Sequence, residues 1–153
     1  MILGTILGGG MSSRLFQNVR EKYGIAYSIY SFTEFLSDCG FFGVYTSTEK
    51  ENIPKTLKLI LKEFRKLREM LIRARELEEA KTQLKGNLIL GMENPMSRMS
   101  RIAKMEMHLG EYITLREVLT EVNAVSAGEI MDIAGTLLDE KGLQTTMLIP
   151  DGD

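Results

Sequence analysis

Apolar residues recur at the spacing of amphipathic helices in the first part of the chain. Residues 1–7 are mostly apolar and run into three consecutive glycines, Gly8 to Gly10. Because glycine commonly ends a helix, this pattern predicts the last turns of one helix followed by a sharp stop. Serine is a favoured helix cap, so Ser12 or Ser13 is expected to begin a second helix, which continues through apolar residues at helical spacing to Gly24.

Three later segments carry the pattern of β-strands. Residues 25–36 are rich in aromatic and β-branched side chains, and residues 41–48 have the same character. Asp38, Cys39 and Gly40 supply turn chemistry between them, so the two segments are expected to form an antiparallel hairpin. Residues 143–149 alternate weakly and predict a final strand.

The remainder of the chain has the signals of five helices. A long helix is expected after Asn52 as its cap, with Pro54 in the first turn. Its apolar stripe comprises Leu57, Ile60, Leu61, Phe64, Leu67 and Leu71. Helices over 75–92 and 97–109 follow, and two capping boxes, Thr114 with Glu117 and Ser126 with Glu129, begin short helices near 115–122 and 127–138.

This order of elements predicts the fold class α+β, an antiparallel sheet with helices packed on one face. No linker or internal repeat divides the chain, so we expect residues 1–153 to form a single domain. Three strands make a thin sheet, and the first helix lacks its beginning. We therefore expect at least one further strand upstream of Met1.

Composition narrows the classes of function. With 44% hydrophobic residues among 153, the chain can bury a substantial core, and its net charge of -2 gives no general argument for nucleic acid. The apolar start is too short to span a bilayer. Cys39 is the single cysteine, which fits a reducing, cytoplasmic location. A zinc site needs three or four clustered ligands, and with one histidine, His108, no metal site is expected in this chain.

Three features have competing interpretations. The glycine run can bind phosphate ahead of a helix, but it matches no nucleotide-binding motif, so a turn between packed helices is favoured. The basic stretch from Lys55 to Arg75 can suit nucleic acid, but acidic residues interrupt it, which favours a solvated helix face. The methionines Met92, Met96, Met99, Met105 and Met107 can form an adaptable binding surface, although core packing is the commoner role.

Arg20 and Tyr27 are the candidate site residues. Arg20 falls on the last turn of the predicted second helix and Tyr27 at the head of the following strand, so both side chains can converge on a peptide or an anion. The alternatives are that Arg20 pairs with an acid such as Glu21 or complements the end of its helix, and that Tyr27 is one more strand aromatic.

The chain resembles the C-terminal half of the pitrilysin/insulinase family of zinc peptidases over essentially its whole length. The segments that carry the resemblance are Leu7 to Phe16, Val19 to Lys22, Gly24 to Ser28, Gly40 to Tyr45, Glu78 to Gly86 and Met99 to Arg101. Within the family it looks most similar to bacterial relatives of the mitochondrial processing peptidase beta subunit. One departure is Arg73, which stands where relatives often have a threonine that caps the second long helix.

The resemblance implies that the catalytic zinc lies in a separate N-terminal half, on an inverted H-x-x-E-H motif that this chain lacks. It maps the family's arginine and tyrosine, seven residues apart, onto Arg20 and Tyr27. In the family these side chains close over the zinc site, bind the substrate backbone carbonyl and help to stabilise the tetrahedral intermediate. Tyr27 is then catalytic, and Arg20 and Tyr27 are substrate-binding. The family's C-terminal half also carries a first strand and the head of a helix that are missing here.

The leading hypothesis is that this chain is the substrate-binding portion of a zinc-dependent processing endopeptidase and is inactive alone. Its expected partners are a zinc-bearing half or subunit, a peptide substrate and, because a bare sheet edge can pair with a copy, a second copy of the chain. Nucleic acid and membrane are not expected partners. The alternative is a non-catalytic scaffold, like the core subunits of respiratory complexes.

Overall fold

The computed structural model of the protein describes residues 1–36 and 38–149. Its elements, in chain order, are α1 (Ile2–Gly8), η1 (Phe16–Glu21), β1 (Ala26–Phe35), β2 (Gly40–Thr48), η2 (Lys50–Asn52), α2 (Ile53–Glu69), α3 (Ala74–Gly91), α4 (Pro95–Leu109), α5 (Leu115–Ala124), α6 (Ala127–Leu137) and η3 (Glu140–Gly142). The predicted α+β class is confirmed. None of the helices among the described residues is long and apolar enough to cross a bilayer.

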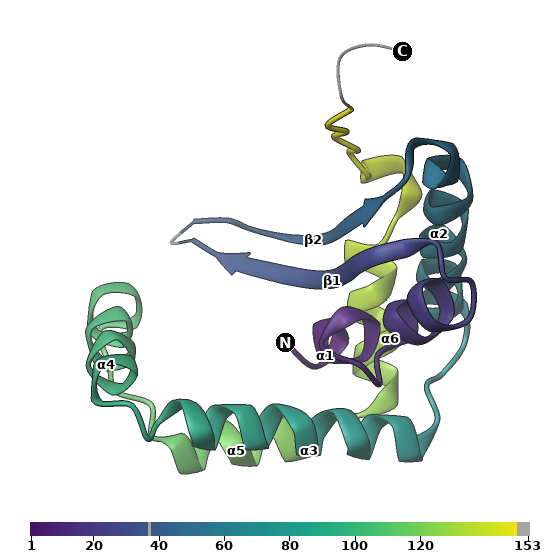
Figure 1. The fold of residues 1–153 in the computed structure, drawn as a ribbon. Helices are drawn as coiled ribbons and strands as arrows, with labels where there is room; N and C mark the ends of the chain where they lie inside the picture. The colour runs from purple at the N-terminus through teal and green to yellow at the C-terminus, as the bar shows by residue number, and fades with distance from the viewer. Residues whose placement is uncertain (37, 150–153) are drawn as a thin grey trace.

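The sheet among the described residues is one antiparallel hairpin of β1 and β2, paired from Ala26 opposite Thr48 to Phe35 opposite Gly40. The hairpin projects from the helical part of the molecule, with α1 beneath β1 (Figure 1). The hydroxyl of Ser31 on β1 donates to the carbonyl oxygen of Gly4 on α1 at 2.8 Å. Helix and sheet are thus joined by a polar contact as well as by apolar packing.

The prediction of a final strand over residues 143–149 is wrong. These residues are exposed, and none of them is paired with β1 or β2. A strand forms only where a neighbouring strand satisfies its backbone groups, and weak alternation of side chains cannot supply that neighbour. The third strand of the expected sheet is therefore absent from the described residues.

The core lies where α1, η1 and the start of β1 meet α2, α3 and α6. Leu7, Leu15 and Val19 are fully buried. Of the predicted stripe on the long helix, Ile60, Phe64 and Leu67 are buried, and Leu57 and Leu61 are partly buried. Leu71 was wrongly placed in this stripe: α2 ends at Glu69, and Leu71 is 61% exposed.

Some of the helix caps predicted from the sequence form in the structure and others do not. Both capping boxes are present: the hydroxyls of Thr114 and Ser126 accept from the backbone N–H of Glu117 and Glu129, at 3.2 Å each. Asn52 is the N-cap residue of α2, as predicted, but its side chain makes no capping hydrogen bond and donates instead to Glu49 at 3.2 Å.

The serine cap predicted after the glycine run is wrong. The hydroxyl of Ser13 donates back to the carbonyl oxygen of Gly10 at 2.6 Å, and the helical segment that follows has no side-chain cap. The hydroxyl therefore tightens the glycine turn rather than the start of the helix.

The methionines are not core residues as favoured from the sequence. Helix α4 buries none of its residues, and Met96, Met99 and Met107 are exposed. In Figure 1 this helix stands apart from α1 and α2, at the far end of α3. His108, on the last turn of α4, is exposed as well.

Candidate functional site

Arg20 lies on a π-helical segment, η1, rather than on the α-helix expected from the spacing of apolar residues. The backbone N–H of Lys22 donates to the carbonyl oxygen of Gln17 at 3.0 Å, the i to i−5 bond that defines this geometry. Such segments are rare and frequently occur at functional sites. The segment keeps Val19 fully buried while Arg20 is exposed.

Gly24 turns the chain from η1 into β1. It has φ of 62°, in the left-handed region that glycine adopts without a steric penalty. Its N–H donates to the carbonyl oxygen of Arg20 at 3.0 Å, so the turn begins directly at the arginine backbone. The helical segment ends at Glu21 with Lys22 as its C-cap, so the stop predicted at Gly24 comes slightly earlier and Gly24 forms the turn that follows.

A β-bulge sets the direction of Tyr27. Ala26 pairs with Thr48 but Ser28 pairs with Ser47, so Tyr27 is the extra residue of β1 at this point. Ala26 and Ile29 are both buried although three positions apart, whereas Tyr27 is 83% exposed. Bulges commonly re-aim a side chain beside a site, and this one turns the phenol away from the core.

Arg20 and Tyr27 line the same surface depression, of about 600 Å³. Its other walls come from the turn after η1, the end of β2 and the segment before α2: Glu21, Gly24, Ile25, Ala26, Ser47, Thr48, Glu49 and Asn52. The Thr48 hydroxyl donates to the Ile25 carbonyl oxygen, which ties the end of β2 to the start of β1 beneath the depression. Both predicted residues therefore border one surface depression, and their joint action on a ligand stays a prediction.

The guanidinium of Arg20 lies over an aromatic ring. Its Cζ lies 4.8 Å from the centroid of the Phe16 ring, one helical turn earlier. Among the described residues Arg20 takes part in no ion pair, so the alternative of a pair with Glu21 is not realised there. Its donors remain available to a ligand oxygen.

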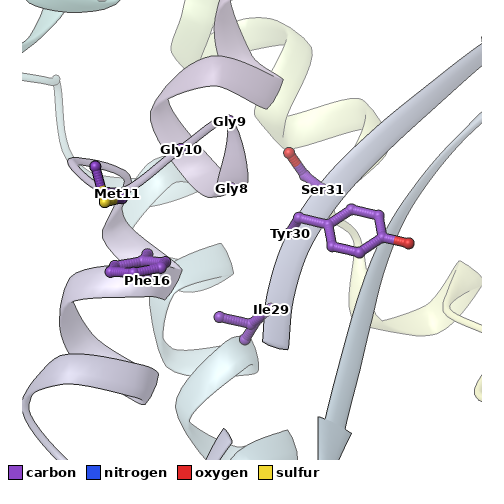
Figure 2. Close-up of a pocket in the computed structure, with 8 residues that line it drawn as sticks. All are labelled: Gly8, Gly9, Gly10, Met11, Phe16, Ile29, Tyr30 and Ser31. Carbon is purple, nitrogen blue, oxygen red and sulfur yellow. The ribbon is translucent and has the colours of Figure 1, made fainter. Parts of the chain in front are cut away.

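The glycine turn, residues 8–10, lies between α1 and the segment that leads into η1. A Cβ at Gly8 would lie 2.3 Å from the backbone nitrogen of Ser31, so only glycine allows α1 this close to β1. The turn borders a second depression, of about 410 Å³, shown in Figure 2, where Phe16 lies below Met11 at its edge. This close packing favours the predicted turn between packed elements over a phosphate site.

Helix α3 anchors the same turn. Arg14 forms a bidentate ion pair with Glu76, at 2.6 and 2.9 Å, and Gln83 donates to the carbonyl oxygen of Gly9 at 2.8 Å. Bidentate pairs fix geometry as well as distance. The segment that carries Phe16 and Arg20 is thus attached to a long, regular helix.

Three basic residues in the second half of α2 form intramolecular ion pairs. Arg65 pairs with Glu140 at 2.5 Å, Lys66 with Glu63 at 2.6 Å, and Arg68 with Asp139 at 3.6 Å. The hydrogen bond from Arg65 lowers the pKa of Glu140 below its usual value. These contacts support the interpretation of this stretch as a solvated helix face.

The described residues do not fit a zinc ion. Residues 1–36 and 38–149 contain no group of three or more histidine, cysteine, aspartate or glutamate side chains that could hold a metal. Cys39 and His108, the residue types that zinc prefers, are both exposed and lie on different elements.

Sequence reasoning missed three contributors to the site: Phe16 beneath Arg20, the bulge at Tyr27, and the wall formed by Glu49 and Asn52. The four-residue spacing of Phe16 and Arg20 was a usable signal, because residues at i and i+4 share a helix face. The bulge and the wall depend on how β2 pairs with β1, which no local pattern reveals.

The chain matches the sequence profile of the family described as "Peptidase M16 inactive domain" over residues 1–84. Uncharacterized zinc proteases of Streptomyces coelicolor and Bacillus subtilis are each 39% identical to it over 92% of this chain, which corresponds to 30% and 34% of their own lengths. A conserved protein from Enterococcus faecalis of known crystal structure is 32% identical, with a TM-score of 0.75 over 87% of this chain and 31% of that one.

The chain thus spans about a third of the length of the curated relatives it matches. The matched segment contains the glycine turn, η1, both strands, all of α2 and the α3 residues that anchor the turn. This protein belongs to the family of peptidase M16 inactive domains, the C-terminal, zinc-free part of zinc-protease-like proteins.

Proposed function

We propose that this chain is the substrate-binding portion of a zinc-dependent processing endopeptidase and that Arg20 and Tyr27 are its working residues. The observation that carries the proposal is that these two side chains, from different elements, line one open depression and are both exposed. The relatives named zinc proteases support the class of reaction. The zinc and the base that activates water belong to a separate zinc-bearing half.

The chemistry of the pair suits a peptide carbonyl. A guanidinium presents fixed donors and keeps its charge, and a phenol donates one hydrogen bond to an oxygen. Both interactions strengthen as negative charge develops on that oxygen in the tetrahedral intermediate, which is how such donors accelerate acyl transfer. Arg20 and Tyr27 both bind the carbonyl oxygen, and both stabilise the oxyanion that develops on it.

The walls of the depression suit an extended peptide. The Ser47 hydroxyl can hydrogen-bond a peptide backbone, and the carboxylates of Glu21 and Glu49 flank the same surface. We infer that the chain forms one domain, faces the zinc-bearing half and takes unfolded peptide segments between them. Because β1 and β2 have no further strand beside them among the described residues, a second copy can also add at the edge of the hairpin.

The test is reconstitution with the zinc-bearing half. Cleavage of an unfolded peptide should need both components, and Arg20→Ala should lower kcat by about a hundred-fold or more, the usual effect of removing one donor to a developing oxyanion. Arg98→Ala, on exposed α4 outside the depression, is the matched control and should keep the wild-type rate. Equal rates for wild type and Arg20→Ala would refute the assigned role.

A scaffold role is the competing hypothesis. A scaffold needs neither a free guanidinium nor an outward phenol. If the chain is a scaffold, substitution of Arg20 or Tyr27 would leave its assembly with partners intact, and no peptide cleavage would appear with the wild-type chain either. Sedimentation of the assembled complex alongside the cleavage assay separates the two functions.

A further inference from the structure

The contact between Phe16 and Arg20 places an exposed guanidinium over a half-buried aromatic ring. Phe16 is half-buried and is the first residue of the π-helical segment, directly after Leu15, whose side chain is fully buried. Figure 2 shows its ring below Met11 and near the strand that carries Ile29. Arg20 is exposed and takes part in no ion pair among the described residues, so the ring is its one aromatic contact there.

An unrestrained arginine is poorly suited to binding one carbonyl oxygen. A long exposed side chain loses rotamer entropy when it is held in one conformation. A cation placed over an aromatic ring, with the 4.8 Å separation seen here, is attracted by the negative face of that ring. The ring therefore restricts the guanidinium before a ligand arrives.

We propose that Phe16, which lines the neighbouring depression, is a positioning residue for Arg20: its ring restricts the guanidinium of a residue that lines the other depression together with Tyr27. This inference rests on the proposed function of Arg20. The required property is an aromatic face and not apolar bulk, so tyrosine should replace phenylalanine and leucine should not. Phe16 itself touches no substrate and is not catalytic.

The chain offers a matched control on the same segment. The Tyr23 ring lies 5.1 Å from Nζ of Lys55 and 5.9 Å from Nζ of Lys22, so it makes cation contacts of the same kind that do not involve Arg20. Tyr23 is 42% exposed and does not line the depression. Tyr23→Leu therefore removes an equivalent contact without touching the proposed device.

The first measurement uses proton NMR of the unmodified chain. Stacking over the ring should shift the δ-methylene protons of Arg20 upfield, and Tyr23→Leu should leave that shift in place. Phe16→Leu should abolish it and Phe16→Tyr should retain it. An Arg20 resonance at its random-coil position in the wild-type chain overturns the proposal without any variant, so a variant that fails to fold does not block the test.

The second measurement is kinetic, in the peptidase assembled with its zinc-bearing half. Phe16→Leu should lower kcat/KM by about two- to five-fold, which is the about 0.5–1 kcal/mol of an exposed cation–π contact converted at 1.36 kcal/mol per tenfold. Phe16→Tyr and Tyr23→Leu should stay near the wild-type value. In the Arg20→Ala background, Phe16→Leu should have no further effect.

The outcomes separate this inference from the function on which it rests. Equal losses from Phe16→Leu with and without Arg20 mean a merely structural role and overturn the inference. If Arg20→Ala leaves cleavage unchanged while the upfield shift is present, the proposed function of Arg20 fails although the ring holds the guanidinium. If Arg20→Ala abolishes cleavage and the shift is absent, the function stands and the positioning role is refuted.

Discussion

Adding one methyl group at Gly8 should lower the free energy of unfolding of the chain. In Gly8→Ala the new Cβ would lie 2.3 Å from the backbone nitrogen of Ser31 and 2.9 Å from the carbonyl carbon of Tyr30. Ordinary contact begins near 3.4 Å, so the end of α1 must withdraw from β1 by about 1 Å. Backbone atoms form the obstacle, so no side-chain rotation can relieve the clash.

The size of the effect follows from two losses. Overpacking of this kind costs about 1–3 kcal/mol. The withdrawal also lengthens the 2.8 Å bond from Ser31 to the Gly4 carbonyl oxygen beyond hydrogen-bonding distance, which costs about 1 kcal/mol more. The gain in helix propensity is small because Gly8 is the last residue of α1. We expect a loss of about 2–4 kcal/mol in the free energy of unfolding.

The assay is urea unfolding followed by circular dichroism, with Gly86→Ala as the matched control. Gly86 lies inside α3, and nothing stands within 4 Å of its would-be Cβ. The same substitution there should raise stability by about 0.5–1 kcal/mol. Opposite signs for the two variants support the close approach of α1 to β1. A Gly8→Ala variant as stable as the wild type would refute it.

Two further predictions concern stability. Hydrogen bonds within the capping boxes lower the pKa of Glu117 and Glu129 below the usual 4.5, so their contribution to folding stability is complete above that value and is lost as pH falls through the native pKa. The double variant Glu117→Gln with Glu129→Gln should therefore show a weaker dependence of unfolding free energy on pH between those limits. An unchanged pH dependence would contradict the assignment. Lys81 is 5% exposed and donates to the Asn123 carbonyl oxygen at the end of α5, at 2.9 Å. Lys81→Met should therefore lower the free energy of unfolding, measured in urea, by about 1–3 kcal/mol. The control Lys85→Met loses only an exposed hydrogen bond to the side chain of the same Asn123 and should cost much less.

Local signals in the sequence predicted the helices with strong caps. Thr114 with Glu117 and Ser126 with Glu129 begin α5 and α6 as expected, because a capping box is complete within four residues. Helix α4 ends before Gly110, which has φ of 68°, as expected, but it begins at Pro95, two residues before the predicted start at residue 97. The hairpin was equally accessible, since its two strands are neighbours in sequence.

Features that depend on tertiary contacts were missed or misjudged. The hydroxyl of Ser13 and the side chain of Asn52 have partners more favourable than a helix end, Gly10 and Glu49. Whether a methionine is buried depends on what lies opposite α4, which the sequence of α4 does not contain. The alternation in residues 143–149 says nothing about whether another strand is beside them.

The candidate site also has features that the sequence predicts and features that it does not. Arg20 and Tyr27 were found from their positions on a helix and a strand, and they do line one depression. The π-helical geometry of η1 and the bulge that turns Tyr27 outward come from pairing and packing over many residues. These two features decide where the side chains point, and only the structure supplies them.

The most direct test of the central claim is the effect of Tyr27→Phe on peptide cleavage by the chain assembled with its zinc-bearing half. The substitution removes one hydroxyl and keeps the ring, so folding and assembly should be unchanged. We expect kcat to fall by about ten-fold or more while KM changes little, because the lost hydrogen bond acts on the developing oxyanion. Tyr112→Phe, at an exposed tyrosine outside the depression, should keep the wild-type kcat. A wild-type kcat for Tyr27→Phe would contradict the account.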